Sequence, residues 1–235
     1  MYREKKVLAV VPARGGSKGV LLKNIHPLLG RPLIAHVAPV IANVSHIDRA
    51  VVSTDDPAIT DAARSAGLDV PFVRPGTLAR DTTGDHEVLV HALQETERVF
   101  GDRYDVIVML QPTSPLRKAR HVKATIEKLV DEGWDAVWTL TLTDAKYHPV
   151  KQLTIDDQGQ MRPYDGEFRV MIRQELSTVY HRNGAAYAFT RECLLEHGSI
   201  FGRSSAALVI DEPMVSIDTL EDFAEVEERL HSRQP

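Results

Sequence analysis

The sequence predicts an α/β protein, built on a Rossmann-like, mostly parallel sheet with helices on both faces and carrying a small insertion. Two observations support this fold class. Short apolar runs of strand length alternate with helix-like stretches, an order typical of parallel strands joined by right-handed crossovers. The alternation is lost only over residues 146–182, which we interpret as the insertion. We expect a single domain over residues 1–235, because a chain of this length commonly forms one α/β domain.

Composition excludes several classes of function. The formal net charge of −5 provides no basic surface for nucleic acid. No apolar run is long enough to span a bilayer, and the polar N-terminus leads directly into a strand rather than into the apolar region of a signal peptide. The single cysteine, Cys193, rules out an intramolecular disulfide, and its helix-like surroundings favour a buried structural thiol. We expect a cytoplasmic protein that binds neither membrane nor nucleic acid.

The elements follow from apolar runs and from the turn residues between them. Strands are predicted at residues 7–11, 49–54, 70–73, 105–110, 134–141, 183–187 and 207–210. Helices are predicted at residues 32–41, 59–66, 87–100 and 122–131, with a final helix that follows residues 215–222 and ends near residue 230. Inside the insertion, residues 150–155 and 160–164 are typical of a hairpin, whose second strand must be an edge because it contains Pro163.

The loop after the first strand, residues 12–24, reads PARGGSKGVLLKN and combines glycines with cations. Its glycines allow tight turns and close approach of the backbone to a ligand. Exposed N–H groups beside Arg14, Lys18 and Lys23 would form an anion-binding concavity. The alternative is a surface turn with solvated charges, but a buried strand leads straight into this loop, which favours phosphate binding. The glycine spacing matches neither the P-loop of nucleoside triphosphatases nor the dinucleotide-binding fingerprint.

This loop resembles the N-terminal signature of the CMP-sialic acid synthetases, or acylneuraminate cytidylyltransferases, which reads close to PARGGSKG-x-x-x-KN. Residues 110–117, LQPTSPLR, resemble the second signature of the same family. The resemblance covers essentially the full chain and implies a fold of the nucleotide-diphospho-sugar transferase type. It also implies an enzyme that uses Mg²⁺ to transfer CMP from CTP to the anomeric hydroxyl of a nonulosonic acid, such as sialic or legionaminic acid, with release of pyrophosphate.

The resemblance assigns the residues that bind the nucleotide, which are Ala13, Arg14, Gly15, Gly16, Ser17, Asn24, Thr82 and Gln111. Arg14, Lys18 and Lys23 would neutralise the phosphates during catalysis. Gln111 is favoured as a functional residue because a bare turn would not need a glutamine at that position.

Other positions near the nucleotide leave alternatives open. Thr82 and Thr83 could equally cap the helix that follows them. Arg117 could pair with a phosphate or with the neighbouring acidic helix. Gly84 and Asp85 stand where small hydroxyl residues are common in the family. We therefore expect the base to be read mainly by the backbone and by Gln111.

Three short motifs in or beside the insertion, HPVK, RQEL and NGAAY, resemble family segments in the correct order. They assign Lys151, Arg173 and Tyr187, respectively, to the sugar acid, whose carboxylate an arginine or a lysine would hold. In the family the insertion reaches over the partner subunit's active site, so we expect a homodimer. A disordered loop is the alternative, and the hairpin pattern counts against it.

The segment VSIDT, residues 215–219, resembles a family segment that often reads IDIDT, with both aspartates on the catalytic Mg²⁺. Asp218 keeps the second aspartate, while Ser216 replaces the first. A site with one carboxylate is still chemically reasonable, because substrate phosphates and waters complete the octahedron of magnesium. The alternative for Asp218 is a residue at a helix N-terminus, where the helix dipole favours a negative charge.

Other functions are compatible with parts of the sequence. A cytidylyltransferase for another acid, such as Kdo, pseudaminic acid or a phosphonate, is the nearest alternative in chemistry. A nucleotide-dependent oxidoreductase could use Asp55 as the acidic residue after the second strand, but the glycine spacing argues against it. A catalytically inactive homologue that only binds nucleotide is supported by Ser216. No residue stands out as a general base.

Overall fold

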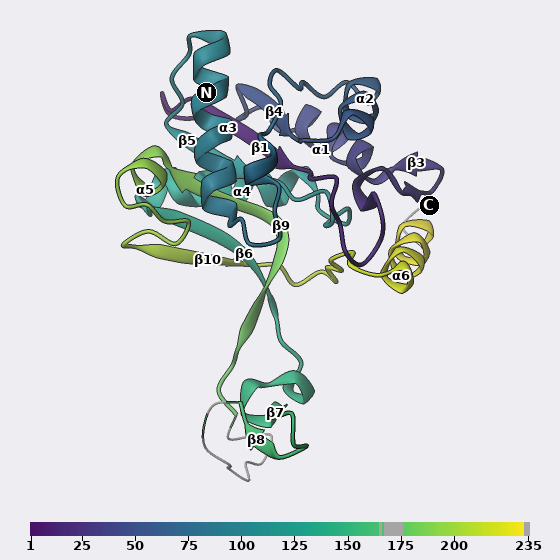
Figure 1. Ribbon diagram of the computed structural model, residues 1–235. Coiled ribbons are helices and arrows are strands. Elements are labelled where there is room, and N and C mark those ends of the chain that lie inside the picture. Colours follow the sequence, from purple (N-terminus) through teal and green to yellow (C-terminus); the bar gives the residue numbers. More distant parts are fainter. Residues whose placement is uncertain (165, 167–175, 233–235) are drawn as a thin grey trace.

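A six-stranded sheet organises the computed structural model, which describes residues 1–164, 166 and 176–232 (Figure 1). In order across the sheet, its strands are β10 (Ser205–Val209), β6 (Ala136–Leu142), β9 (Tyr180–Thr190), β5 (Val106–Met109), β1 (Val7–Pro12) and β4 (Arg49–Ser53). β9 runs antiparallel to both of its neighbours, and the other strands run parallel to one another. The prediction of a mostly parallel sheet is therefore confirmed.

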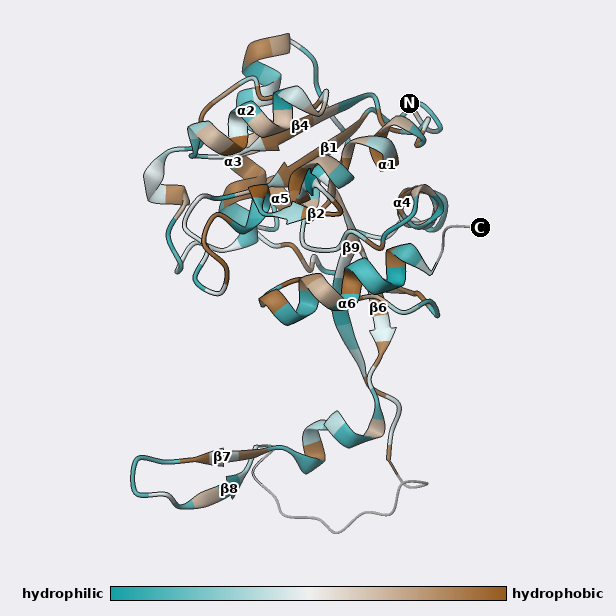
Figure 2. Cartoon of the chain, turned by 90° about the vertical axis from the view of Figure 1, so that its right-hand side faces the viewer, coloured by the Kyte–Doolittle hydropathy of each residue, from teal (hydrophilic) through white to brown (hydrophobic). Residues whose placement is uncertain are grey.

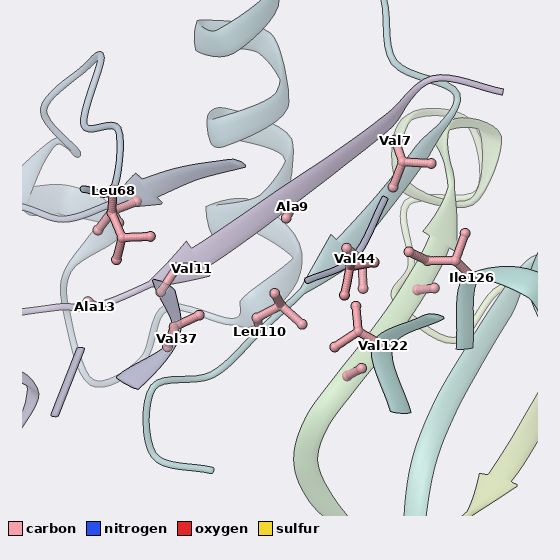
Figure 3. Packing of buried hydrophobic residues seen from close by; sticks show 14 of the residues in the cluster. Val7, Ala9, Val11, Ala13, Val37, Val44, Leu68, Leu110, Val122 and Ile126 are labelled. Carbon is pink, nitrogen blue, oxygen red and sulfur yellow. The ribbon is translucent and has the colours of Figure 1, made fainter. Parts of the chain in front are cut away.

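Helices cover both faces of this sheet. They are α1 (Ala38–Ala42), α2 (Pro57–Ser65), α3 (Asp85–Phe100), α4 (Ala119–Glu132) and α5 (Arg191–Leu195), and α6 (Leu220–His231) ends the described chain. Because successive side chains of a strand point to opposite faces, β1 contributes to two buried clusters. Val7, Ala9 and Val11 pack with residues of α2 and α4 (Figure 3), whereas Leu8 and Val10 pack with residues of α3 and α5. No helix in the described ranges is long and apolar enough to cross a membrane.

The strand predicted at residues 70–73 is wrong. Only Asp69 pairs with the sheet, through a single parallel bridge to Val51. Val70 and Phe72 are nevertheless buried. The apolar pattern that predicted a strand therefore reflects a loop that is buried. Pro71 lacks an N–H group and cannot continue the ladder beside β4.

The helix predicted at residues 32–41 is present as two shorter pieces. A 3₁₀ helix, η2 (Leu33–His36), is followed by α1. Pro39 stands near the start of α1 and has no N–H group to donate to the preceding turn, which explains why a single α-helix does not run through both. A small hairpin, β2 (Pro27–Leu28) and β3 (Arg31–Pro32), precedes η2.

The segment between β6 and β9 projects away from the sheet (Figures 1 and 2). β6 and β9 continue as a two-stranded ribbon, and the described part beyond it holds η4 (Ala145–Tyr147), η5 (Pro149–Lys151) and the hairpin of β7 (Leu153–Ile155) and β8 (Met161–Pro163). The predicted hairpin is therefore present. Apolar side chains exposed on this projection are Leu142, Tyr147, Leu153, Ile155, Met161, Tyr164 and Tyr180.

Gly184 allows β9 to pass closely over the loop that follows β5. Its φ of +69° lies in the left-handed region. A Cβ atom there would stand 2.6 Å from Oε1 of Gln111 and would also collide with Oγ of Ser114. The glycine of the NGAAY motif is thus a packing requirement of the loop that carries Gln111.

We predict that Gly184→Ala lowers the free energy of unfolding by about 2–5 kcal/mol, the sum of a left-handed alanine and an overpacked contact. Gly101→Ala is the matched control, because Gly101 has a φ of +71° but no atom near its missing Cβ. The control should lose only the backbone part, about 1–2 kcal/mol. Urea unfolding of the two variants measures the difference, and equal losses would contradict the contact with Gln111 and Ser114.

Candidate active site

A cleft of about 550 Å³ opens at the carboxyl ends of β1 and β5, where open α/β sheets bind ligands. Four segments line it: the loop within residues 12–24, the segment 74–88, the loop 111–113 and the segment 216–218. These segments are distant in sequence, and the strand order brings them to one edge of the sheet. Of the residues predicted to bind nucleotide or metal, six line the cleft besides Arg14: Ser17, Lys18, Lys23, Asn24, Gln111 and Asp218.

The Gly-rich loop is held by its own polar groups. Ala13 donates its N–H to the carbonyl of Ser53 (2.9 Å), and Ser17 donates to the carbonyl of Gly15 (3.0 Å). Gly15 donates to Oδ1 of Asp55 (3.1 Å). The prediction that free N–H groups form an anion-binding concavity is therefore wrong for Ala13, Gly15 and Ser17. Anion binding in this loop depends more on its cationic side chains.

Asp81 pairs with two of these cations. One oxygen of its carboxylate lies 2.8 Å from a guanidinium nitrogen of Arg14, and the other lies 2.8 Å from Nζ of Lys18. The hydrogen bonds from Lys18 and Arg14 hold the pKa of Asp81 below its usual range. Asn24 fixes the backbone beside this pair, because its Nδ2 donates to the carbonyl of Arg14 (3.0 Å). Sequence reasoning missed Asp81, since nothing local marks it as the partner of residues more than sixty positions earlier.

Lys23 joins the Gly-rich loop to the segment VSIDT. Its Nζ donates to the carbonyl of Ile217 (2.8 Å) and to Oδ1 of Asp218 (2.7 Å). The N–H of Ile217 in turn donates to the carbonyl of Thr113 (2.8 Å), which anchors the segment to the loop after β5. Gly19 is required here, because a Cβ at that position would collide with the carbonyl oxygen of Asp218.

Thr219, and not Asp218, caps α6. The hydroxyl of Thr219 accepts the N–H of Asp222 (3.3 Å), and the carboxylate of Asp222 accepts the N–H groups of Asp218 and Thr219 (2.8 Å each). The carboxylate of Asp218 is therefore free of the helix end. It is 74% exposed, lines the cleft and pairs with Lys23.

The donor set around Asp218 fits a magnesium ion that takes most of its ligands from a substrate. Within the described residues, no group of three or more histidine, cysteine, aspartate or glutamate side chains could hold a metal. Asp218 and Ser216 line the same cleft and offer one carboxylate and one hydroxyl. Such a pair suits a hard cation whose octahedron is completed by phosphate oxygens and waters.

Arg74 and Asp85 also line the cleft, and sequence reasoning gave neither a role in the nucleotide site. Arg74 is buried, and its guanidinium donates to Oγ (3.0 Å) and to the carbonyl of Ser53. Burial lowers the pKa of Arg74 to about 10. Burial raises the pKa of Asp85, while Arg182 and Arg74 act in the opposite direction. In the sequence, only the position of Arg74 between an apolar run and Pro75-Gly76 could have marked it as a residue of the cleft.

Arg117 takes neither of the two roles considered for it. Its guanidinium is buried and donates to the carbonyls of Ala185 (3.0 Å) and Gln111. Burial lowers its pKa to about 9. The prediction of a phosphate or an acidic helix as its partner is wrong, because the side chain turns inward and supports the backbone that presents Gln111.

Thr82 is exposed and does not line the cleft, so its contact with the nucleotide stays a prediction. The capping alternative is wrong. Gly84 is the N-cap of α3, and its N–H is accepted by Oε2 of Glu87 (2.7 Å). Thr83 does line the cleft, and its hydroxyl donates to the carbonyl of Thr77 (3.3 Å).

Lys151 and Tyr187, two of the residues predicted to bind the sugar acid, do not line this cleft. Lys151 is exposed on η5, in the projecting segment. Tyr187 is buried in β9, where its ring stacks on Trp138 (5.0 Å) and its hydroxyl accepts the N–H of Gly184 (2.7 Å). Arg173 lies outside the described residues. Gly16, like Ala13 and Gly15, is not among the lining residues of the cleft.

Comparisons with known proteins show the family to which the chain is similar. A family model described as cytidylyltransferase matches residues 8–225. Similar curated proteins are a pseudaminic acid cytidylyltransferase of Campylobacter jejuni (31% identity over 93% of both chains) and a CMP-N,N'-diacetyllegionaminic acid synthase of Legionella pneumophila (30%, over 97% of this chain and 98% of that one).

A similar solved structure is a CMP:2-keto-3-deoxy-manno-octonic acid synthetase complexed with CTP. Its TM-score is 0.72 at 18% identity, with 97% of this chain and all of that chain covered. At this level of identity the comparison establishes the fold of the chain.

We predict that Asp81→Asn tightens the binding of pyrophosphate, because it removes a carboxylate that competes with phosphate oxygens for Arg14 and Lys18. The dissociation constant, measured by calorimetry at low ionic strength, should fall roughly two- to fivefold, since exposed ion pairs are weak and are screened by salt. Asp61→Asn, an equal change of charge on the exposed face of α2, is the control and should have no effect. Unchanged or weaker binding in Asp81→Asn would contradict the assignment of the two cations to phosphate.

Proposed function

The chain belongs to the cytidylyltransferase family, and we propose that it transfers CMP from CTP to the anomeric hydroxyl of a nonulosonic acid, releasing pyrophosphate. The observation that carries the proposal is the cleft at the carboxyl edge of the sheet. Arg14, Lys18 and Lys23 all line it, and each is paired with a carboxylate that a phosphate could replace. Relatives named for pseudaminic and legionaminic acid support the class of acceptor.

The chemistry proposed for this cleft is mainly charge neutralisation. Attack on the α-phosphate of a triphosphate develops negative charge on the phosphate oxygens and on the leaving pyrophosphate, and fixed cations stabilise it. Arg14 and Lys18 would exchange Asp81 for phosphate oxygens, and Lys23 would exchange Asp218. The hydrogen bonds of the loop backbone would keep these side chains in place during the exchange.

We also propose Mg²⁺ as the cofactor, with Asp218 as its protein carboxylate. Once Lys23 turns to the phosphates, the carboxylate of Asp218 becomes available to a hard cation. When bound, Mg²⁺ would neutralise charge on the triphosphate and polarise its phosphoryl oxygens. Ser216 would contribute weakly or through a water, because a serine hydroxyl is a poor direct ligand beside a carboxylate.

A homodimer would bring a cation to the acid substrate. Lys151 is exposed on the projecting segment and does not line the cleft of its own chain. Exposed apolar side chains on the same segment, Ile155, Met161 and Tyr164 among them, support its docking on a second copy. A monomer mass in light scattering, together with full activity, would contradict this. A cytoplasmic location stays a prediction.

The two rival functions have less support. Asp55, which an oxidoreductase would need on a ribose hydroxyl, accepts the N–H of Gly15 instead. An inactive nucleotide-binding homologue would use the three cations as well, but it would have no need of the cleft-facing carboxylate of Asp218. The acid itself is proposed only as a class, with pseudaminic, legionaminic and sialic acids as its members.

We predict that the purified protein releases pyrophosphate from CTP, with little turnover of ATP, GTP or UTP, when a nonulosonic acid and Mg²⁺ are present. A panel of sialic, legionaminic and pseudaminic acids and Kdo, assayed by coupled pyrophosphate release, tests this. Arg14→Ala should lose about 1.5–3 kcal/mol of transition-state binding, because it removes a charged phosphate contact. Equal turnover of UTP, a preference for GTP, or full activity of Arg14→Ala would contradict the proposal.

We further predict that Asp218→Asn abolishes turnover even at high magnesium, whereas Ser216→Ala leaves it nearly intact. A site with one carboxylate has no second one to retain the metal. Ser216→Asp should tighten the apparent affinity for Mg²⁺. Activity against magnesium concentration for the three variants measures this. If Asp218→Asn stayed active and Ser216→Ala were inactive, the metal would lie elsewhere.

A further inference from the structure

Arg182 is a cation at the edge of the cleft. β9 carries it into the sheet from the projecting segment (Figure 1), and because β9 runs antiparallel to β5, its first residues lie at the carboxyl edge where the cleft opens. Arg182 pairs with Leu140 and stands two residues before Gly184, whose backbone passes closely over Gln111. Gln111 lines the cleft, whereas Arg182 is exposed and outside its lining. This position suits contact with a substrate that extends out of the cleft.

Trp138 orients the guanidinium of Arg182. The guanidinium carbon lies 5.4 Å from the centre of the Trp138 ring, within the range of a cation–π contact. The indole is itself fixed, because its Nε1 donates to the carbonyl of Ile200 (2.9 Å) and its ring stacks on Tyr187. Within residues 1–164, 166 and 176–232, no hydrogen bond or ion pair uses the N–H groups of the Arg182 guanidinium. Those N–H groups lie in a planar fork that matches the two oxygens of a carboxylate.

The charge of Arg182 acts on groups of the cleft wall. Burial raises the pKa of Asp85, and the charge of Arg182 is the larger of the two charges that oppose this rise. Burial also raises the pKa of Tyr187, against the N–H of Gly184 and the charge of Arg182. Asp85 lines the cleft but forms no ion pair with Arg182. The positive charge therefore reaches the cleft without being neutralised by a neighbouring carboxylate.

The second substrate of the proposed reaction needs such a cation. A nonulosonic acid has its carboxylate on the anomeric carbon, so the reaction brings this anion within a few bonds of a triphosphate, and the two repel unless each has a cation of its own. The cations of the Gly-rich loop are assigned to the phosphates. Of the other arginines in the cleft, Arg74 is buried on Ser53, and Arg80 adjoins Asp81 on the side of the phosphates. Arg182 has neither commitment.

We propose that Arg182 binds the carboxylate of the acid acceptor at the cleft of its own chain, with Trp138 as the platform that orients its guanidinium. The inference rests on the proposed function and goes beyond it, because it assigns the acid group of the acceptor to one side chain that sequence reasoning missed. It does not depend on the proposed homodimer, since β9 and the cleft belong to the same chain. An acceptor that has lost the charge of its carboxylate should be a poor substrate.

Pyrophosphate release with an acid and with its methyl ester, which lacks the carboxylate charge, tests this. The acids are sialic, legionaminic and pseudaminic acid, and the pair is made from the one that wild-type protein turns over. Arg182→Gln should lower kcat/KM for the acid about tenfold to a hundredfold, because it removes a charged hydrogen bond. Its kcat/KM for the ester and its KM for CTP should stay those of the wild type. Arg182→Lys, which keeps the charge but not the planar fork, should retain part of the activity with the acid.

Arg98→Gln is the matched control. It removes an exposed arginine from α3 that pairs with Glu95 and does not line the cleft. Its kinetics with acid and ester should equal those of the wild type. The inference would be overturned, while the proposed function stood, if Arg182→Gln kept the wild-type kcat/KM for the acid, or lost as much with the ester as with the acid. Wild-type protein that used acid and ester equally well would overturn it too. Wild-type protein that turned over none of the three acids would overturn both.

Discussion

The pairing of cations with carboxylates across one cleft is the constraint on which the account of this site depends. Arg14, Lys18 and Lys23 come from one loop, and like charges brought together repel one another. Asp81 and Asp218, from two other walls, compensate them. Because a phosphate oxygen offers the same hydrogen-bonding pattern as a carboxylate oxygen, a triphosphate can replace the internal partners without rearranging the loop.

The fold brings together parts of the chain that lie almost two hundred residues apart. β1 ends in the Gly-rich loop, and β5, its neighbour, ends in the loop that carries Gln111. Lys23 reaches the carbonyl of Ile217, whose own N–H is fixed on Thr113. A hydrogen bond from the Lys23 side chain and one between backbone groups thus tie three loops into one wall. The buried side chain of Arg117 stiffens that wall from behind.

Much of the fold and part of the cleft could be predicted from the sequence, because buried strands and glycine loops leave local patterns. The cleft-lining places of Lys23 and Gln111 are examples, while that of Asp218 was implied by the family resemblance. What could not be predicted is the choice of partner, which only the tertiary structure decides. Arg117 turns inward to carbonyls, and the apolar residues 70–73 form a buried loop beside Pro71 rather than a strand. The partners of Arg117 leave no local signal, whereas Pro71 inside the apolar run was a local indication against a strand.

The central claim is that a triphosphate takes over the cations that Asp81 and Asp218 hold. A crystal structure of the protein with CTP and Mg²⁺ tests it most directly. We expect phosphate oxygens on Arg14, Lys18 and Lys23, with both carboxylates released from these side chains. A nucleotide bound elsewhere, with the pairs of Asp81 and Asp218 intact, would contradict it.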